Sequence, residues 1–250
     1  MRIIDLCCGV GPWRNRDPLL PYSAAQLLEL LEHFGIDSAL VYARLTGESG
    51  SIEDGQAIVR EATDYSPRFL STISLDNCPH RDAAAVNERN LRESGAKIAW
   101  YHPPAGVKPS PWMYEEIADF SAQRRLPWLI ELGRWAPDDI HQLCAAFPTL
   151  RVILTGLDYR GEEWLYPLLA RHDELRACLA PRFITPLGVE RFVARFGVSR
   201  LLFGSGLPES SPGGLIGYVM YSDISDDEKA AILGGNAETL LREVELCAAR

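Results

Sequence analysis

The sequence has no segment of the kind that enters or crosses a membrane. No apolar run approaches the roughly 20 residues that a helix needs to span a bilayer, and no basic stretch followed by an apolar one stands at the start. We therefore expect a cytoplasmic protein that has no membrane partner.

Positive charge is scarce as well. The 250 residues include 25 lysines and arginines against 34 aspartates and glutamates, which gives a formal net charge of -9. An acidic chain has no general attraction for nucleic acid, whose phosphates are bound through lysine and arginine. We therefore expect no nucleic-acid partner and interpret the acidity as a contribution to solubility.

Several cofactor and metal motifs are missing. The six cysteines form no CxxC pair and no zinc-finger spacing, so we expect reduced thiols that mostly pack in the core. No GxGxxG follows the first strand and no GxxxxGK[ST] occurs, which removes the signatures of dinucleotide and P-loop nucleotide binding. Coiled-coil heptads and repeats of about 20 to 50 residues are absent too. The motifs therefore indicate no cofactor.

What the sequence does have is a regular alternation of strand and helix patterns. The predicted strands lie within residues 1–13, 36–44, 69–75, 96–102, 127–133, 151–156, 176–181 and 201–206. The predicted helices lie within residues 24–35, 53–65, 81–94, 112–125, 137–147, 164–173, 188–196, 225–233 and 236–247. Eight such units fit a barrel better than an open doubly wound sheet. The sequence thus predicts an α/β fold, a (β/α)8 TIM barrel, with residues 1–250 as a single domain.

The first strand carries the earliest polar residues. Residues two apart on a strand face the same side, so Asp5, Cys7 and Gly9 are expected to share one face. Cys8 is expected to face the helices. Asp5 lies deeper than Cys7, and this depth favours hydrogen bonds to the backbone or to an arginine over contact with a substrate. In a TIM barrel the functional residues lie at the carboxyl ends of the strands.

Seven segments spread over the chain carry a family resemblance. They are IIDLCCGVG, SPRFLSTISLD, GAKIAWYHP, LPWLIELG, FPTLRVILTGLD, VSRLLFGSGLP and ILGGNAETLL. The first is similar to an opening Ile-Asp-x-His-x-His-x-Gly and the last to a closing Asn-Ala-x-x-Leu helix. The chain therefore resembles, nearly end to end, the amidohydrolase-related family of metal-dependent hydrolases, which also contains decarboxylases and metal-independent lactonases. The resemblance implies a distorted amidohydrolase-like barrel.

The resemblance also implies where the family's metal ligands would stand. They correspond to Cys7 and Gly9 for the paired first-strand histidines, Glu131 and Gly156 for the histidines of strands five and six, and Gly206 for the aspartate of strand eight. Glycine supplies no side-chain ligand, whereas a catalytic zinc site normally has at least three protein ligands. We therefore expect no metal and a divergent member without the family metal site. A relocated metal on Cys7, Glu131 and His102 would have to bridge distant strands.

Glu131 and His102 are the first two catalytic candidates. Strand phase points Glu131 into the barrel mouth, where it is a general base or a substrate anchor, or else one half of an ion pair with a nearby arginine such as Arg134 or Arg182. His102 ends the fourth strand in a segment that resembles the family's Lys-x-His-Pro. It is a general acid or a substrate ligand, or a histidine that bonds to the following loop.

Other strand ends supply further candidates. Cys7 is a nucleophile if a base lies within reach of its thiolate, and otherwise a packing residue. Arg44 and Arg182 are the cations for a ligand carboxylate, although each also suits a surface salt bridge. Trp100 would line the pocket left by the glycines, and Ser205 stands where barrel loops often bind anionic groups.

Two hypotheses for the function follow. The first is a catalytically silent homologue, or pseudoenzyme, that binds a small molecule or acts as a scaffold. The alternative is a metal-independent hydrolase, of lactonase, amidase or decarboxylase type, that acts on a small carboxylate-bearing substrate with Glu131 as general base. A homo-oligomer is compatible with this class of barrel, but no patch in the sequence identifies an interface.

Overall fold

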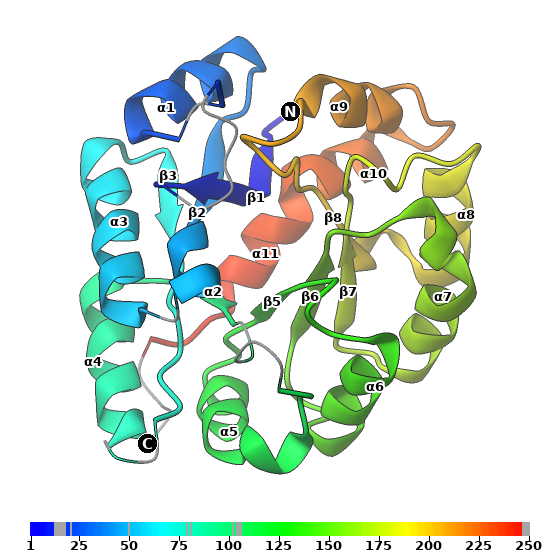
Figure 1. Ribbon diagram of the computed structural model, residues 1–250. Coiled ribbons are helices and arrows are strands. Elements are labelled where there is room, and N and C mark those ends of the chain that lie inside the picture. The colour runs from blue at the N-terminus through cyan, green and yellow to red at the C-terminus, as the bar shows by residue number, and fades with distance from the viewer. Residues whose placement is uncertain are drawn as a thin grey trace.

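In the part of the chain that the structure describes, eight strands alternate with helices (Figure 1). The structure, a computed structural model, describes residues 1–12, 19–20, 22–49, 51–78, 80, 82–101, 103 and 107–246. The strands are β1 (Ile4–Val10), β2 (Ser38–Ala43), β3 (Phe69–Ser71), β4 (Ala99–Trp100), β5 (Trp128–Glu131), β6 (Val152–Thr155), β7 (Leu175–Cys178) and β8 (Leu201–Leu202). The helices are α1 (Ala24–His33), α2 (Arg44–Ser49), α3 (Ile52–Tyr65), α4 (Ala83–Ser94), α5 (Glu115–Gln123), α6 (Pro137–Ala146), α7 (Glu162–Arg171), α8 (Gly188–Phe196), α9 (Pro212–Met220), α10 (Asp226–Ala230) and α11 (Asn236–Arg242).

The strands are all parallel and fall into two hydrogen-bonded sheets, β1-β2-β3 and β4-β5-β6-β7-β8. Two narrow seams join the sheets into a barrel. At one seam Ile73 accepts a backbone hydrogen bond of 2.9 Å from Trp100. At the other, the backbone nitrogen of Leu6 donates to Phe203 over 3.0 Å and that of Gly9 donates to Leu207 over 2.7 Å. The barrel closes with short pairings at both seams, as the predicted distortion implies.

A β-bulge in the first strand changes which residues face inward. Asp5 pairs with Ala39 and Cys8 pairs with Val41, so β1 has one residue more than β2 between these two points. Cys7 therefore packs in the barrel interior, while Asp5 shares the outward phase of Ala39 and Val41. The prediction that Asp5 lies on the same face as Cys7 is wrong. The prediction that Cys8 packs against the helices is confirmed.

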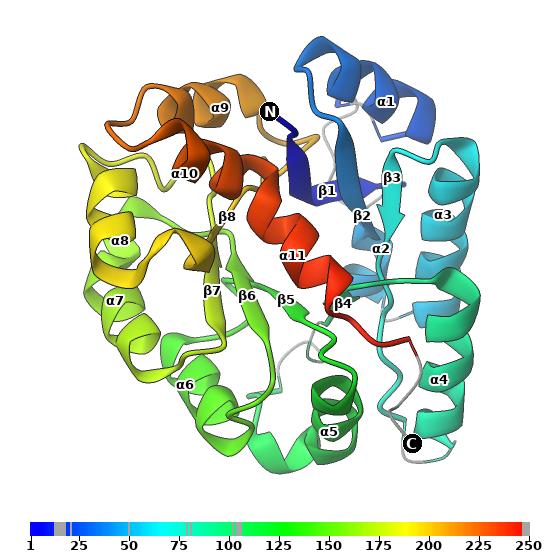
Figure 2. The same cartoon turned by 180° about the vertical axis from the view of Figure 1, so that it is seen from behind.

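Helix α11 closes the amino-terminal end of the barrel. Figure 2 shows it crossing in front of the strands. Its Ala237 and Leu240 are buried against the inward side chains of the strands, such as Ile4. The apolar residues between strands and helices form the larger part of the core. Side chains therefore fill the interior below the carboxyl ends of the strands, which is the end at which TIM barrels bind ligands.

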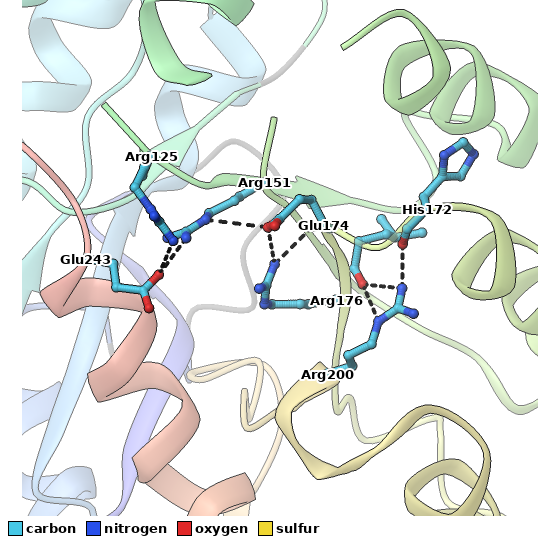
Figure 3. A network of polar contacts seen from close by, with 8 residues as sticks. Arg125, Arg151, His172, Glu174, Arg176, Arg200 and Glu243 are labelled. Carbon is cyan, nitrogen blue, oxygen red and sulfur yellow. Dashed lines mark hydrogen bonds and ion pairs between the residues drawn. The ribbon is translucent and has the colours of Figure 1, made fainter. Parts of the chain in front are cut away.

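An ion-pair network fastens the segment after α11 to the base of the barrel (Figure 3). The Glu243 carboxylate pairs with Arg125 over 2.7 Å and with the buried Arg151. Arg151 also lies 3.5 Å from Glu174, which in turn pairs with Arg176 over 3.1 Å. Because Arg151 is only 4% exposed, its charge depends on these carboxylates for compensation.

The helices that the sequence predicts are present, usually within three residues of the expected ends, but two further helices are not foreseen by the pattern. Helix α2 lies between β2 and α3, where the sequence pattern predicts no helix. Helix α9 contains Gly213, Gly214 and Gly217, which lower its intrinsic helix propensity. Its Leu215 and Val219 are buried in the core, so tertiary packing stabilises this helix. Among the described residues, no helix is both long and apolar enough to span a bilayer.

Candidate functional site

A cavity of about 360 Å³ opens at the carboxyl ends of the strands. Its described lining comes from β1, from β5 and β6, and from the segments that follow β2, β7 and β8. The polar lining residues are Cys7, Arg44, Glu131, Thr155, Arg182, Glu209 and Ser210. This is the end of a TIM barrel at which ligands bind, and the volume is within the range of small-molecule sites.

Arg44 is the central cation of the cavity. It follows β2 directly, and its side chain is only 16% exposed. One terminal nitrogen of the guanidinium lies 2.8 Å from a carboxylate oxygen of Glu209, and the other lies 3.9 Å from one of Glu131. The guanidinium carbon is 5.8 Å from the centre of the Tyr42 ring. Two carboxylates and an aromatic ring therefore hold the charge of Arg44 in the mouth.

The absence of a side chain at Gly9 gives Arg44 its space. A Cβ atom built on Gly9 would lie 2.9 Å from Nε of Arg44, which is closer than real Cβ contacts. Any larger residue at this position would have to displace the arginine. The Arg44 side chain thus fills the space above β1 that a residue with a side chain at position 9 would use.

Glu131 ends β5 and reaches the cavity as strand phase predicts. Its side chain is 31% exposed, and it forms the ion pair with a nearby arginine that the sequence interpretation offered, although the partner is Arg44 and neither of the two examples, Arg134 and Arg182. Burial raises the pKa of the Glu131 carboxyl group, Arg44 and Arg134 act to lower it, and Glu209 raises it further. A carboxyl group with a raised pKa beside a cavity is suited to proton transfer as well as to binding.

Cys7 lies at the floor of the cavity and is 6% exposed. Its sulfur accepts a hydrogen bond from the Thr155 hydroxyl over 3.3 Å and lies 3.3 Å from the Tyr42 hydroxyl. Burial raises the pKa of the Cys7 thiol to about 11, although both hydroxyl contacts lower it. The thiol is therefore protonated at neutral pH, which favours the packing interpretation over the nucleophile.

Ser205 and Trp100 do not line the cavity in the described part of the chain. Ser205 is fully buried, donates its hydroxyl to the Asp5 carboxylate, and accepts a hydrogen bond from the Leu207 backbone over 3.0 Å. Asp5 also accepts from the backbone nitrogens of Cys7 and Ser205, both over 2.9 Å, in accordance with its predicted structural role. Trp100 stacks inside the barrel on the Tyr42 ring, with 4.3 Å between the ring centres. Ser205 therefore lies buried against Asp5, and Trp100 lies in the barrel interior, so neither side chain lines the cavity.

Arg182 and His102 are the two remaining predicted site residues. Arg182 follows β7, lines the cavity and is exposed, and no ion pair of Arg182 occurs among the described residues. His102 lies outside the described residues. Thr155 and Glu209 line the cavity but were not among the predicted site residues. The signal for Thr155 was its place at the end of β6, where it pairs in register with Glu131.

The backbone conformation explains why two positions at the mouth are occupied by glycine. Gly156 has a φ of +72° and Gly206 a φ of +74°, a region of backbone conformation that residues with a Cβ rarely adopt. Gly156 directly follows β6, and Gly206 lies in the loop after β8. Among the described residues, no group of three or more His, Cys, Asp or Glu side chains is placed to share one metal ion.

The fold and the cavity define a TIM-barrel protein with a small-molecule site at the strand ends. The family model described as amidohydrolase matches residues 20–242, so the chain belongs to the amidohydrolase family. This family includes metal-dependent decarboxylases and hydrolases. No curated protein sequence matches the chain significantly.

Solved structures of low sequence identity confirm the predicted fold. An uncharacterised TIM-barrel protein from Bordetella bronchiseptica is 17% identical, with a TM-score of 0.74 over 97% of this chain and 99% of its own. A dihydroxybenzoic acid decarboxylase from Polaromonas sp. JS666, solved with bound manganese, is 14% identical, with a TM-score of 0.79 over 96% and 97%. A 2,6-dihydroxybenzoate decarboxylase in complex with 2,6-dihydroxybenzoate is 14% identical, with a TM-score of 0.75 over 96% and 98%.

Proposed function

We propose that this barrel binds a small carboxylate-bearing molecule in the mouth cavity and works without the divalent metal of its relatives, as a catalytically silent member of the family. The observation that carries this proposal is the position of Arg44, whose guanidinium occupies the space above Gly9 and is held by Glu131 and Glu209. A permanent cation of the protein thus stands in the mouth.

The described residues do not fit a divalent cation at this position. Glu131 is paired with Arg44, and Gly9, Gly156 and Gly206 carry no side chain that could coordinate a metal. A metal ligand must be deprotonated and free to coordinate, and a second cation beside the guanidinium would be repelled. Arg44 and Arg182 instead supply donors that match a carboxylate, as arginine does in many binding sites.

Metal analysis and thermal melting test the proposal together. We expect purified protein to contain far less than one metal ion per chain, and we expect added zinc or manganese to leave the melting temperature unchanged. Because a ligand stabilises the state that binds it, saturating 2,6-dihydroxybenzoate should raise the melting temperature by on the order of 5 °C. A stoichiometric metal that raises the melting temperature would contradict the proposal.

A matched pair of variants locates the binding. Arg182→Met removes the exposed cation of the cavity, and Arg171→Met removes an exposed arginine at the end of α7 that does not line it. We expect the first substitution to weaken the stabilisation by 2,6-dihydroxybenzoate and the second to leave it unchanged. Equal effects of the two variants would place the ligand elsewhere.

A second candidate function is supported by Glu131. Its carboxyl group has a raised pKa, lines the cavity, and is held by Arg44 only at 3.9 Å. These properties suit the general base of a metal-independent hydrolase that acts on a carboxylate-bearing lactone or amide. Hydrolysis of such compounds should then fall by a factor of about 100 or more in Glu131→Gln. Activity that is unaffected by Glu131→Gln would exclude this role.

A further inference from the structure

The guanidinium of the mouth cavity already has a carboxylate partner before any ligand enters. Among the described lining residues, Arg44 and Arg182 are the cations, and Glu131 and Glu209 are the carboxylates. A ligand carboxylate that binds Arg44 would meet Glu209, which lies 2.8 Å from the same guanidinium. In a partly buried site this is costly, so a carboxylate of the protein has to leave or a proton has to be taken up.

Glu209 is the carboxylate that can leave. Its side chain is 42% exposed, compared with 31% for Glu131 and 16% for Arg44. Glu209 stands in the loop after β8, whereas Glu131 is part of β5 and pairs in register with β6. Rotation of the Glu209 side chain into solvent breaks one ion pair of 2.8 Å and leaves every strand in place.

The wall beside this ion pair indicates the rest of the ligand. Leu157 and Ala180 are buried lining residues of the cavity, and Leu132 and Pro181 add further apolar surface. An arginine that faces a carboxylate, with an apolar wall next to it, matches a compact aromatic or aliphatic monocarboxylate.

We propose that Glu209 occupies the place on Arg44 that the carboxylate of a ligand takes, so that binding exchanges one carboxylate for another. This inference rests on the proposed binding function and adds how the ligand carboxylate reaches Arg44. The protein carboxylate keeps the guanidinium paired while the site is empty, and it competes with the ligand. Only compounds that carry their own carboxylate can replace it at Arg44 without loss of the ion pair.

Calorimetric titration with 2,6-dihydroxybenzoate tests the exchange. We expect Glu209→Gln to bind this probe about two- to fivefold more tightly than the wild type, because the competing ion pair is removed. The control is Glu238→Gln, which removes the same charge from an ion pair with Arg2 at the opposite end of the barrel. The control should bind like the wild type. The neutral amide, 2,6-dihydroxybenzamide, should gain nothing from Glu209→Gln.

The number of protons taken up on binding gives a second test, which uses the wild-type protein. If Glu209 leaves as a carboxylate, the wild type takes up no proton on binding, and the heats in phosphate and in Tris buffer at one pH agree after dilution is subtracted. Uptake of close to one proton per site would overturn the exchange, because the protein would then neutralise a carboxylate and keep it in place.

The two proposals fail in different ways. If the wild type binds the probe and Glu209→Gln binds it equally or less tightly, the exchange is overturned and the binding function stands. If neither protein binds it, the binding function is overturned and the exchange with it. Binding by Glu209→Gln alone would overturn the exchange, since Glu209 would then block the site outright and no ligand would replace it in the wild type.

Discussion

The Asp5 carboxyl group is completely buried between β1 and the segment after β8. It accepts hydrogen bonds from the Ser205 hydroxyl and from the backbone nitrogens of Cys7 and Ser205. Burial nevertheless raises the pKa of Asp5 to about 6, because three donors do not replace the lost water. The carboxylate thus helps to join the ends of β1 and β8 at some cost when it is charged.

This pKa predicts a dependence of stability on pH. The unfolded carboxyl group titrates near 3.8 and the folded one near 6, so the folded state binds more protons between these values. The contribution of Asp5 to the free energy of unfolding is therefore full below about pH 4, and it falls by about 3 kcal/mol as the pH rises to about 6. Asp5→Asn should lack this decline. Urea unfolding of both proteins from pH 4 to pH 7 measures it, and parallel pH profiles would contradict the prediction.

At the same scale, the sequence indicated which residues reach the mouth more reliably than which partners they have. Strand phase placed Glu131 correctly, because β5 is regular. Its ion pair is with Arg44, because the positions of β2 and β5 around the barrel determine which charges meet. The roles predicted for Cys7, Arg44, Arg182 and Ser205 remain to be measured, and His102 lies outside the described residues.

At the scale of elements, the closing helix α11 is anchored by Asn236. Its side-chain nitrogen donates to the backbone oxygens of Val198 and Leu201, over 2.8 and 2.9 Å, and so ties α11 to the start of β8. The resemblance in the segment ILGGNAETLL includes this residue. A structural contact therefore explains the asparagine without any role in catalysis.

Removal of this anchor should destabilise the barrel. Asn236→Ala leaves two partly buried backbone oxygens without their donor, and we expect a loss of about 1–3 kcal/mol in the free energy of unfolding. Thr239→Ala is the control, because the Thr239 hydroxyl bonds only to Gly235 within the exposed first turn of the helix. This control should cost less than about 0.5 kcal/mol by urea unfolding. Similar losses in both variants would show that Asn236 is not an anchor.

The elements also show where pattern reading fails. The bulge in β1 adds a residue that no alternation rule includes, and it moves Asp5 away from the face of Cys7. Helix α9 forms despite its three glycines, because burial of Leu215 and Val219 outweighs their propensity. In both cases contacts with neighbouring elements determine the local structure, which the local sequence alone does not specify.

At the scale of the whole molecule, the base of the barrel is held by charges from distant parts of the chain. Glu243, beyond α11, pairs with Arg125 before β5 and Arg151 before β6. The hydrogen bond from Arg151, with further help from the charges of Arg151 and Arg125, lowers the pKa of the Glu243 carboxyl group. The network links the closing segment to the strands that carry the site at their other ends (Figure 3).

Acid should therefore loosen the closing segment. A carboxyl group whose pKa is lowered by folding contributes stability above its unfolded pKa, and this contribution is lost as the pH falls through the folded pKa. At pH 7 we expect Glu243→Gln to be about 1 kcal/mol less stable than the wild type, and we expect the difference to shrink on acidification toward pH 3. Urea unfolding at several pH values measures this. A difference that is constant with pH would mean that the carboxylate charge is not involved.

The sequence by itself determined the class of fold, the order of the strands and of most helices around them, and the place of Cys7 and Glu131 at the carboxyl ends of β1 and β5. These features follow from the periodicity of apolar residues and from the glycines and prolines that end the helices and strands. Each segment has these local signals irrespective of the rest of the chain. Only the tertiary structure decided that Arg44 lies over Gly9 between Glu131 and Glu209, and that Ser205 is buried against Asp5. These contacts join residues from different strands, and the closure of the barrel determines which of them meet.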